Sequence, residues 1–230
     1  MITAILSSFN EHDNPIFWAN IELLRGACEL IIVDGGSQDG TFARFRGMGV
    51  CVHLAPGASR AQRYNLGMDQ AHGDWIILVH SRSLMSLDTL QQLEREVPQR
   101  VWGGFTHSFD QDHPMLKFTS WYSNQVRGAL ASIFYLDHCL FFSRDLLSDA
   151  RFPDVHIFED TYFCRQLRRV TRGRRLPAIV VTSAVRFQKN GFARQALMNQ
   201  VMKVLFFAGV SEKWMNRIYE RGLSLNMKSE

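Results

Sequence analysis

Short apolar stretches alternate with amphipathic ones along the first hundred residues of the chain. The run Leu30-Ile31-Ile32-Val33 ends abruptly at Asp34 and opens into the glycine-rich stretch 35–41. Four consecutive apolar residues, three of them β-branched, are typical of a central strand in a parallel sheet that is buried on both faces. Comparable runs predict four strands in this part of the chain, at residues 3–7, 29–34, 50–54 and 75–80.

Helical patterns fill the segments between these strands. The predicted helices comprise residues 15–24, 41–46, 59–71 and 87–97. Strands that alternate with helices indicate an α/β fold, with a Rossmann-like, mostly parallel sheet and helices on both of its faces. Because crossovers in such sheets are right-handed, the strand-end loops share one edge, where open α/β folds bind ligands. We therefore expect four loops to meet there, at residues 7–11, 34–40, 56–60 and 80–83.

The second half of the chain is less regular. Its pattern predicts strands at 102–109, 140–143 and 179–181 and a helix at 160–170. No repeat, low-complexity tract or linker interrupts the sequence, so one domain over residues 1–230 is the economical interpretation. Within this domain we expect a nucleotide-binding half at 1–110, an acceptor half at 111–190 and C-terminal helices at 191–230.

The segment 196–210 is apolar except for three polar residues that share one side of a helix, Asn199, Gln200 and Lys203. We consider three interpretations: a helix packed on the domain, a helix on a membrane surface, and a contact between two copies in a homodimer. No apolar run in the sequence approaches the roughly 20 residues that span a bilayer.

Composition restricts the class of protein and its partners. Of the 230 residues, 46% are hydrophobic and 21% are charged, which is typical of a globular protein and excludes a disordered one. The formal net charge of +4 favours anionic partners such as nucleotide phosphates or an acidic membrane surface. This charge is too small to indicate nucleic acid.

Cysteine usage and the N-terminus bear on the compartment. Cys28, Cys51, Cys139 and Cys164 lie far apart without metal-binding spacing, which predicts free thiols in a reducing environment. The first residues carry no basic segment or cleavage site, so we expect no signal peptide. The expected location is the cytoplasm, and peripheral attachment to the inner membrane face is left open.

Three motifs accompany the glycine-rich loop. They are Ser8-Phe9-Asn10-Glu11, Ser59-Arg60-Ala61 with Asn65 and Gly67, and Phe152-Pro153-Asp154 with Phe158-Glu159-Asp160. Their order and spacing resemble the family-2 glycosyltransferases, which have the GT-A fold. The resemblance covers nearly the whole chain and is closest to small bacterial members with the pattern VDGGSxDGT.

This resemblance implies a transferase that takes a sugar from a nucleotide-sugar bound at the strand edge. Glu11 and Asp34 match positions that contact the ribose and base, and Ser7 and Phe9 lie where the family flanks the base. Arg60 matches a basic position near the diphosphate. The acceptor stays open between a lipid-linked molecule, a saccharide and a small molecule.

The resemblance also assigns the catalytic side. Asp160 matches the catalytic base of inverting members, which takes the proton from the acceptor hydroxyl as it attacks the anomeric carbon. Glu159 is the alternative base or orients it. Asp137 precedes the strand at 140–143, where the family often has Gly-Asp-Gln, and we expect it on the acceptor side.

The sequence departs from the family where His-Ala-Asp is usual and its Asp serves a divalent metal such as Mg²⁺ or Mn²⁺. Here His80-Ser81-Arg82 replaces a carboxylate ligand with a cation. A guanidinium can bind phosphate oxygens bidentately, so one hypothesis is a metal-independent transferase in which Arg82 neutralises the leaving diphosphate. Because of this replacement, no residue is assigned to a metal.

Two other hypotheses remain. The chain could be a catalytically inactive nucleotide- or nucleotide-sugar-binding protein of the same fold. It could also be a nucleotidyltransferase, although those enzymes carry a glycine- and basic-rich loop after the first strand, where this chain has Ser8-Phe9-Asn10-Glu11.

Overall fold

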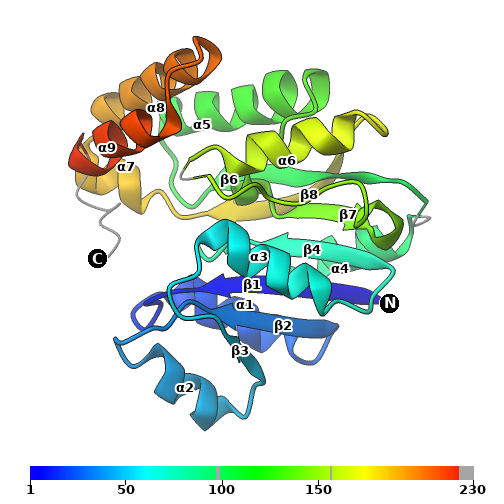
Figure 1. The fold of residues 1–230 in the computed structure, drawn as a ribbon. Helices are drawn as coiled ribbons and strands as arrows, with labels where there is room; N and C mark the ends of the chain where they lie inside the picture. The colour runs from blue at the N-terminus through cyan, green and yellow to red at the C-terminus, as the bar shows by residue number, and fades with distance from the viewer. Residues whose placement is uncertain (97–98, 156, 223–230) are drawn as a thin grey trace.

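An eight-stranded sheet forms the centre of the computed structural model, which describes residues 1–96, 99–155 and 157–222 (Figure 1). The strands follow the order β3-β2-β1-β4-β7-β6-β8-β5. Their bounds are β1 Ile2–Ser8, β2 Glu29–Asp34, β3 Val52–Leu54, β4 Trp75–Val79, β5 Ser83–Leu84, β6 Trp102–Phe109, β7 Leu140–Ser143 and β8 Arg174–Thr182. The strands β3, β2, β1 and β4 run parallel, as the sequence predicts.

Helices connect the strands. Their bounds are α1 Pro15–Leu24, α2 Thr41–Met48, α3 Arg60–Asp69, α4 Leu87–Glu94, α5 Pro114–Trp121, α6 Glu159–Arg168, α7 Val185–Asn190, α8 Phe192–Phe207 and α9 Glu212–Gly222. A π-helix, Tyr122–Leu130, continues α5, and a 3₁₀ helix occupies Leu136–His138. The Ser59 side chain accepts a hydrogen bond from the Gln62 amide while the Gln62 side chain returns one, which is a capping box that fixes the start of α3.

Side chains of the central strands alternate between two apolar cores, as the twofold period of a strand requires. On one face, Leu6 of β1 and Ile77 of β4 join the core formed with α1, α2 and α4. On the other face, Ile5 and Leu78 join the core formed with α3 and α6. Helices therefore cover both faces of the sheet, which is the predicted α/β architecture.

Strand direction decides which chain segments can share a site. Strand β7 is antiparallel to both β4 and β6, and β8 is parallel to β6. The carboxyl ends of β1, β2, β4, β6 and β8 consequently lie at one edge of the sheet. This edge brings segments from both halves of the chain into one place, including the start of α3.

The sequence-based elements differ from the structure mainly in the second half. The helix expected at 87–97 ends at Glu94, and residue 97 lies outside the described residues. Helix α5, its π-helical continuation and β5 were not expected. Strand β8 is longer than the predicted 179–181, because Leu176, Ala178 and Val180 alternate inward from Arg174 onward.

The C-terminal segment forms α7, α8 and α9, which lie together at the top of Figure 1 beside α5. Phe206 of α8 and Met215 of α9 pack in a small core with residues of α6, including Tyr162. Among the described helices, none combines the length and the apolar composition that crossing a bilayer requires.

Candidate active site

The four loops expected to meet at the carboxyl edge are joined by hydrogen bonds. The Gly35 amide donates to the Ser8 carbonyl at 2.9 Å, and the Gly57 amide donates to the Gly35 carbonyl at 3.1 Å. Asn14, at the start of α1, donates from its side chain to Glu11 Oε2 at 2.7 Å and to the Ser81 carbonyl at 2.9 Å, which joins the first loop to the one after β4. The sequence therefore predicted this convergence correctly.

Asp34 shapes the glycine-rich loop from inside. Its Oδ1 accepts from the amides of Gly36 and Ser37 at 2.9 and 2.8 Å, and its Oδ2 accepts from the hydroxyls of Ser8 and Ser37 at 2.8 and 2.6 Å. The side chain is fully buried. Gly36 adopts a φ of +92°, which a residue with a Cβ rarely adopts. Contact between Asp34 and a nucleotide stays a prediction and would require the loop to uncover the carboxylate.

Glu11 follows β1 and Arg82 follows β4, and their charges interact at the carboxyl edge of the sheet. The Glu11 carboxylate accepts from Asn14 Nδ2 at 2.7 Å and interacts electrostatically with Arg82 and Arg63. Burial raises the pKa of Glu11, while these hydrogen bonds and charges oppose the increase. Arg82 is half-buried, so its guanidinium is part of this edge and does not extend freely into solvent.

Arg63 of α3 is a site residue that the sequence analysis missed. Its Nε donates to Ser7 Oγ at 2.7 Å, and its guanidinium carbon lies 5.7 Å from the centre of the Phe9 ring. A Cβ at Gly35 would lie 2.5 Å from Arg63 Nη1, so the glycine leaves room for this cation. The spacing of three residues from Arg60 along a predicted helix was the signal that could have identified it.

Arg60 forms an ion pair with Glu159. Its Nε lies 2.7 Å from Glu159 Oε1 and its Nη2 2.5 Å from the same oxygen. Burial lowers the pKa of Arg60, but the carboxylates of Glu159 and Asp160 outweigh it and hold that pKa above its usual range. The Arg60 side chain keeps 42% of its surface exposed, whereas Glu159 keeps 5%. Two residues predicted for the donor and catalytic sides therefore meet directly.

Asp160 occupies the first turn of α6. Its Oδ1 accepts from the Thr161 amide at 2.7 Å, and its Oδ2 accepts from the Leu136 amide at 3.2 Å. Burial and the neighbouring Glu159 charge raise the pKa of Asp160 to about 7, against the opposing effect of Arg60. A carboxyl group with this pKa can accept a proton near neutral pH, as a general base must.

Phe158 directly precedes the two acids in a left-handed conformation, with a φ of +62°. Its ring centre lies 4.5 Å from that of Phe206 in α8 and 6.4 Å from that of Tyr135. Such a conformation is strained for a bulky residue and persists only where packing holds it. Helix α8 thus helps to fix the start of α6.

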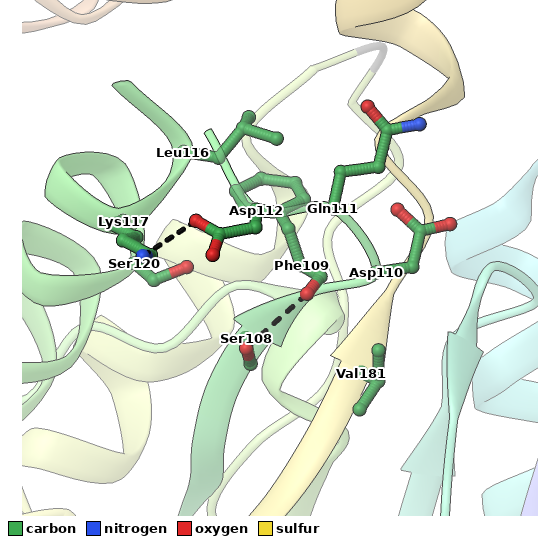
Figure 2. A pocket seen from close by; sticks show the side chains of 9 residues that line it. All are labelled: Ser108, Phe109, Asp110, Gln111, Asp112, Leu116, Lys117, Ser120 and Val181. Carbon is green, nitrogen blue, oxygen red and sulfur yellow. Dashed lines mark hydrogen bonds and ion pairs between the residues drawn. The ribbon is translucent and has the colours of Figure 1, made fainter. Parts of the chain in front are cut away.

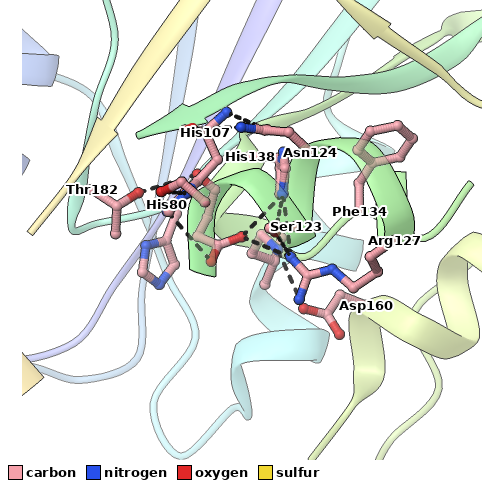
Figure 3. Close-up of polar contacts among 12 residues, drawn as sticks. His80, His107, Ser123, Asn124, Arg127, Phe134, His138, Asp160 and Thr182 are labelled. Carbon is pink, nitrogen blue, oxygen red and sulfur yellow. Dashed lines mark hydrogen bonds and ion pairs between the residues drawn. The ribbon is translucent and has the colours of Figure 1, made fainter. Parts of the chain in front are cut away.

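Asp137 lies in a buried polar cluster that Figure 3 shows in part. Its carboxylate oxygens lie 3.8 Å from His107 Nε2 and 3.9 Å from Arg127 Nη2 and His138 Nε2. His138 Nδ1 lies 2.8 Å from the Phe105 carbonyl and must donate to it, which leaves Nε2 to accept from Ser123 Oγ at 2.7 Å. Burial lowers the pKa of His138 to about 3, so the ring is neutral at pH 7.

The cluster was only partly expected from the sequence. Asp137 was assigned to the acceptor side, but Arg127 comes from the π-helix and carried no motif. Its guanidinium lies 3.4 Å from the centre of the Tyr135 ring and interacts electrostatically with Asp160. In Figure 3 the Arg127 side chain extends between His138 and Asp160. Arg127, a permanent cation, thereby connects Asp137 to Asp160.

A surface hollow of about 620 Å³ opens at the carboxyl end of β6 (Figure 2). Polar side chains such as Ser108 and Asp110 line it together with the apolar Leu116. Ser120 also lines it, and its Oγ lies 3.1 Å from His107 Nδ1. The hollow therefore borders the Asp137 cluster.

The residues at this edge do not fit a divalent metal. Among the described residues, no group of three or more His, Cys, Asp and Glu side chains is arranged to hold an ion. At the end of β4, where the resemblance places a metal carboxylate, Arg82 contributes a positive charge instead. Burial also lowers the pKa of the adjacent His80 to about 3, and Arg60 contributes to that decrease.

Solved structures of glycosyltransferases share this fold. S. aureus TarS matches with a TM-score of 0.58 and 15% identity over 96% of this chain and 42% of TarS. M. tuberculosis glucosyl-3-phosphoglycerate synthase matches with a TM-score of 0.56 and 16% identity over 79% of this chain and 71% of the synthase. The chain thus spans less than half of the TarS structure. The fold is that of the GT-A glycosyltransferases.

Structures of the same two proteins with ligands match similarly. TarS 1–349 in complex with UDP-GlcNAc has a TM-score of 0.58 and 16% identity over 79% of this chain and 58% of that chain. The synthase in complex with Mn²⁺ and UDP-glucose has a TM-score of 0.51 and 17% identity over 78% of this chain and 69% of that chain. No protein-family model matches the sequence, and no curated protein matches it.

Proposed function

We propose that the chain is a glycosyltransferase that moves a sugar from a nucleotide-sugar donor to an acceptor hydroxyl with inversion, and that it does so without a divalent metal. The observation that carries the proposal is the placement of Asp160. A buried carboxyl with a pKa of about 7 lies in the first turn of α6, next to Glu159, which pairs with Arg60 at the donor edge.

The donor half of the site supports a nucleotide ligand. Phe9 lies beside Arg63 at the end of β1, and the glycine-rich loop approaches through Gly35. Structural neighbours of this chain were solved with UDP, UDP-GlcNAc or UDP-glucose. We therefore propose a uridine diphosphate sugar as the donor class, with the base near Ser7 and Phe9 and the ribose near Glu11 and Asp34.

Arg82 takes the electrostatic role that a metal would have at the departing diphosphate. It is half-buried near the carboxyl end of β4, and burial lowers its pKa while Glu11 opposes the decrease. The planar set of donors of a guanidinium suits two phosphate oxygens. Arg60 keeps an exposed part of its side chain on the same edge and can add a second positive charge.

The chemical step then follows from Asp160. Its carboxylate takes the proton of the acceptor hydroxyl while that oxygen forms a bond to the anomeric carbon from the face opposite the leaving group. The bond between the anomeric carbon and the diphosphate oxygen breaks, and its electron pair leaves with the nucleoside diphosphate beside Arg82. Glu159 orients the site through Arg60 and raises the pKa of Asp160.

A second candidate function is binding of the nucleotide-sugar without transfer. The replacement of the metal carboxylate by Arg82 favours it, because loss of a metal ligand is also a route to an inactive protein. The two candidates share the donor half and differ only in whether Asp160 acts. A nucleotidyltransferase is less well supported, since the loop after β1 carries Asn10 and Glu11 rather than a basic, glycine-rich sequence.

Calorimetry and product analysis test the proposal together. Titration with UDP, UDP-glucose and UDP-GlcNAc in EDTA should show binding, and prolonged incubation with the bound sugar nucleotide should release UDP. Asp160→Asn should bind equally and release none. Absence of binding to any nucleotide-sugar would overturn the proposal, whereas binding without turnover in either protein would establish the second candidate.

A further inference from the structure

Helix α8 exposes apolar side chains on its outer face in addition to those that it buries on its inner face. Four apolar side chains on its outer face are strongly exposed, at 67% for Leu197 and Val204, 69% for Phe207 and 40% for Val201. Residues spaced by three, four and seven positions share one side of a helix, so these four form a single stripe. An apolar stripe in water needs an explanation, because globular proteins rarely leave a continuous one uncovered.

The inner face of α8 packs on the domain through the buried Met202 and Phe206, and polar residues on the same side add hydrogen bonds. Gln195 is buried and bonded on both sides, with its Oε1 accepting from Asn190 and its Nε2 donating to Asn199, each at 2.8 Å. Lys203 is half-buried, with its Nζ 5.2 Å from the centre of the Tyr122 ring. Rotating the helix about its axis would break these hydrogen bonds. The apolar stripe is therefore a fixed outward surface.

Positive charge is concentrated in the same part of the chain. Residues 185–222 contain seven Lys and Arg and two Asp and Glu, whereas residues 1–184 contain eighteen and nineteen. The net positive charge of the chain thus resides in the C-terminal helices. Lys213 and Arg217 of α9 are exposed, and Trp214 between them is 51% exposed.

We propose that the outer face of α8 and α9 binds the surface of an anionic lipid bilayer. Outward apolar side chains can enter the boundary between headgroups and acyl chains, while flanking lysines and arginines meet the lipid charge and a tryptophan lies at the interface. A second copy of the chain is a poorer occupant, because pairing two such faces would bring two strongly basic segments together. This inference goes beyond the proposed function and does not depend on it.

The proposed membrane contact of α8 lies close to the start of α6. Phe206, one residue from the exposed Phe207, packs on Phe158 immediately before Glu159 and Asp160. A bilayer beneath α8 would therefore lie close to the helix that carries the proposed base. This geometry suits an acceptor that is itself held at a lipid surface.

Vesicle flotation tests the proposal with the full chain. The protein should float with vesicles that contain roughly one third anionic lipid and much less with neutral phosphatidylcholine vesicles. A triple variant should lower partitioning about tenfold or more; it combines Leu197→Ser, Val204→Ser and Phe207→Ser. A double variant, Lys213→Gln with Arg217→Gln, should weaken partitioning on anionic vesicles only. The matched control combines Leu54→Ser, Leu87→Ser and Leu130→Ser, which removes exposed apolar side chains elsewhere and should leave flotation unchanged.

Three results would overturn the inference. Failure of the unaltered protein to float with anionic vesicles at low salt removes it, and so does flotation that the triple variant on α8 leaves intact. A dimer in solution that this variant converts to a monomer, without vesicle binding, would assign the face to a second copy. Circular dichroism of the same variants shows whether they are folded, and calorimetry with UDP-sugars keeps failure here separate from failure of the proposed function.

Discussion

Glu159 and Arg60 form an ion pair in which Glu159 Oε1 lies 2.7 Å from Arg60 Nε and 2.5 Å from Nη2. They are 99 residues apart in the chain, so the pair fastens the start of α6 to the start of α3. It also sets the charge around Asp160, because Glu159 raises the pKa of that carboxyl and Arg60 lowers it. The pair therefore couples the donor edge to the proposed base.

The first prediction concerns this pair and the pH profile. Transfer should increase through about pH 7 as Asp160 loses its proton. Glu159→Gln removes a negative charge beside Asp160, so the acid limb of kcat/KM against pH should move to lower pH. Glu94→Gln, at an exposed position on α4, is the control and should leave the limb in place. A limb that does not move in Glu159→Gln would show that Asp160 is not the titrating base.

The second prediction concerns stability, and its sign follows from linkage. The folded-state pKa of Asp160, about 7, exceeds its usual value of 3.8, so the folded protein binds more protons than the unfolded chain between about pH 4 and 7. Stability from this group is therefore lost as the pH rises through that window. Asp160→Asn should lose less stability over the same window, by on the order of 3 kcal/mol. Denaturant unfolding at pH 5 and pH 8 measures the free energy of unfolding of each protein. Equal losses in the unaltered protein and in Asp160→Asn would contradict the raised pKa of Asp160.

The third prediction concerns the contact between α8 and α6. Phe206→Ala should lower kcat about tenfold with little change in donor affinity, because Phe158 and the first turn of α6 lose their support. The free energy of unfolding should fall by about 2 to 4 kcal/mol. Phe207→Ala is the matched control, since the adjacent side chain is exposed. Equal effects of the two substitutions in a lipid-free assay would refute the positioning role.

The fourth prediction concerns Gly35. A methyl group there would lie 2.5 Å from Arg63 Nη1, so Gly35→Ala should displace the guanidinium from Ser7 and weaken donor binding about tenfold. Gly47→Ala adds the same group where nothing lies within 4 Å and should leave affinity unchanged. Calorimetry with UDP compares the two. An unchanged affinity in Gly35→Ala would remove Arg63 from the donor site.

The fifth prediction concerns Arg82. Arg82→Ala should lower donor affinity or turnover at least tenfold, which is about 1.4 kcal/mol, and EDTA should not affect the unaltered enzyme. Arg168→Ala, an exposed position on α6, is the control for loss of a positive charge. Strong dependence of the unaltered enzyme on Mg²⁺ or Mn²⁺ would contradict the role given to Arg82.

The first half of the fold was predictable because its signals are local. Apolar runs such as Leu30 to Val33 define buried strands, and helical patterns between them require parallel crossovers. That rule alone gathers Glu11, Asp34 and Arg82 at one edge. The second half depends on long-range packing: Arg127 enters the site through a π-helix, and Phe158 is held in a left-handed conformation by Phe206.

The site shows the same division. The sequence indicated which charged residues lie at the proposed donor site. It did not indicate that the Asp34 oxygens accept hydrogen bonds from their own loop or that Arg60 pairs with Glu159. Those partners are selected by packing between segments that lie far apart in the chain. The outward apolar stripe of α8 was likewise not predictable, because residues 196–210 are apolar on most sides of the helix and do not indicate which side faces outward.

The central claim is that Arg82 replaces a metal at the diphosphate of a nucleotide-sugar. A crystal structure with UDP bound in the presence of EDTA tests this directly. We predict both phosphates at the carboxyl edge of the sheet, with the Arg82 guanidinium hydrogen-bonded to their oxygens and the uracil beside Phe9. A diphosphate bound away from Arg82, or one that binds only with a divalent ion held by carboxylates, would contradict it.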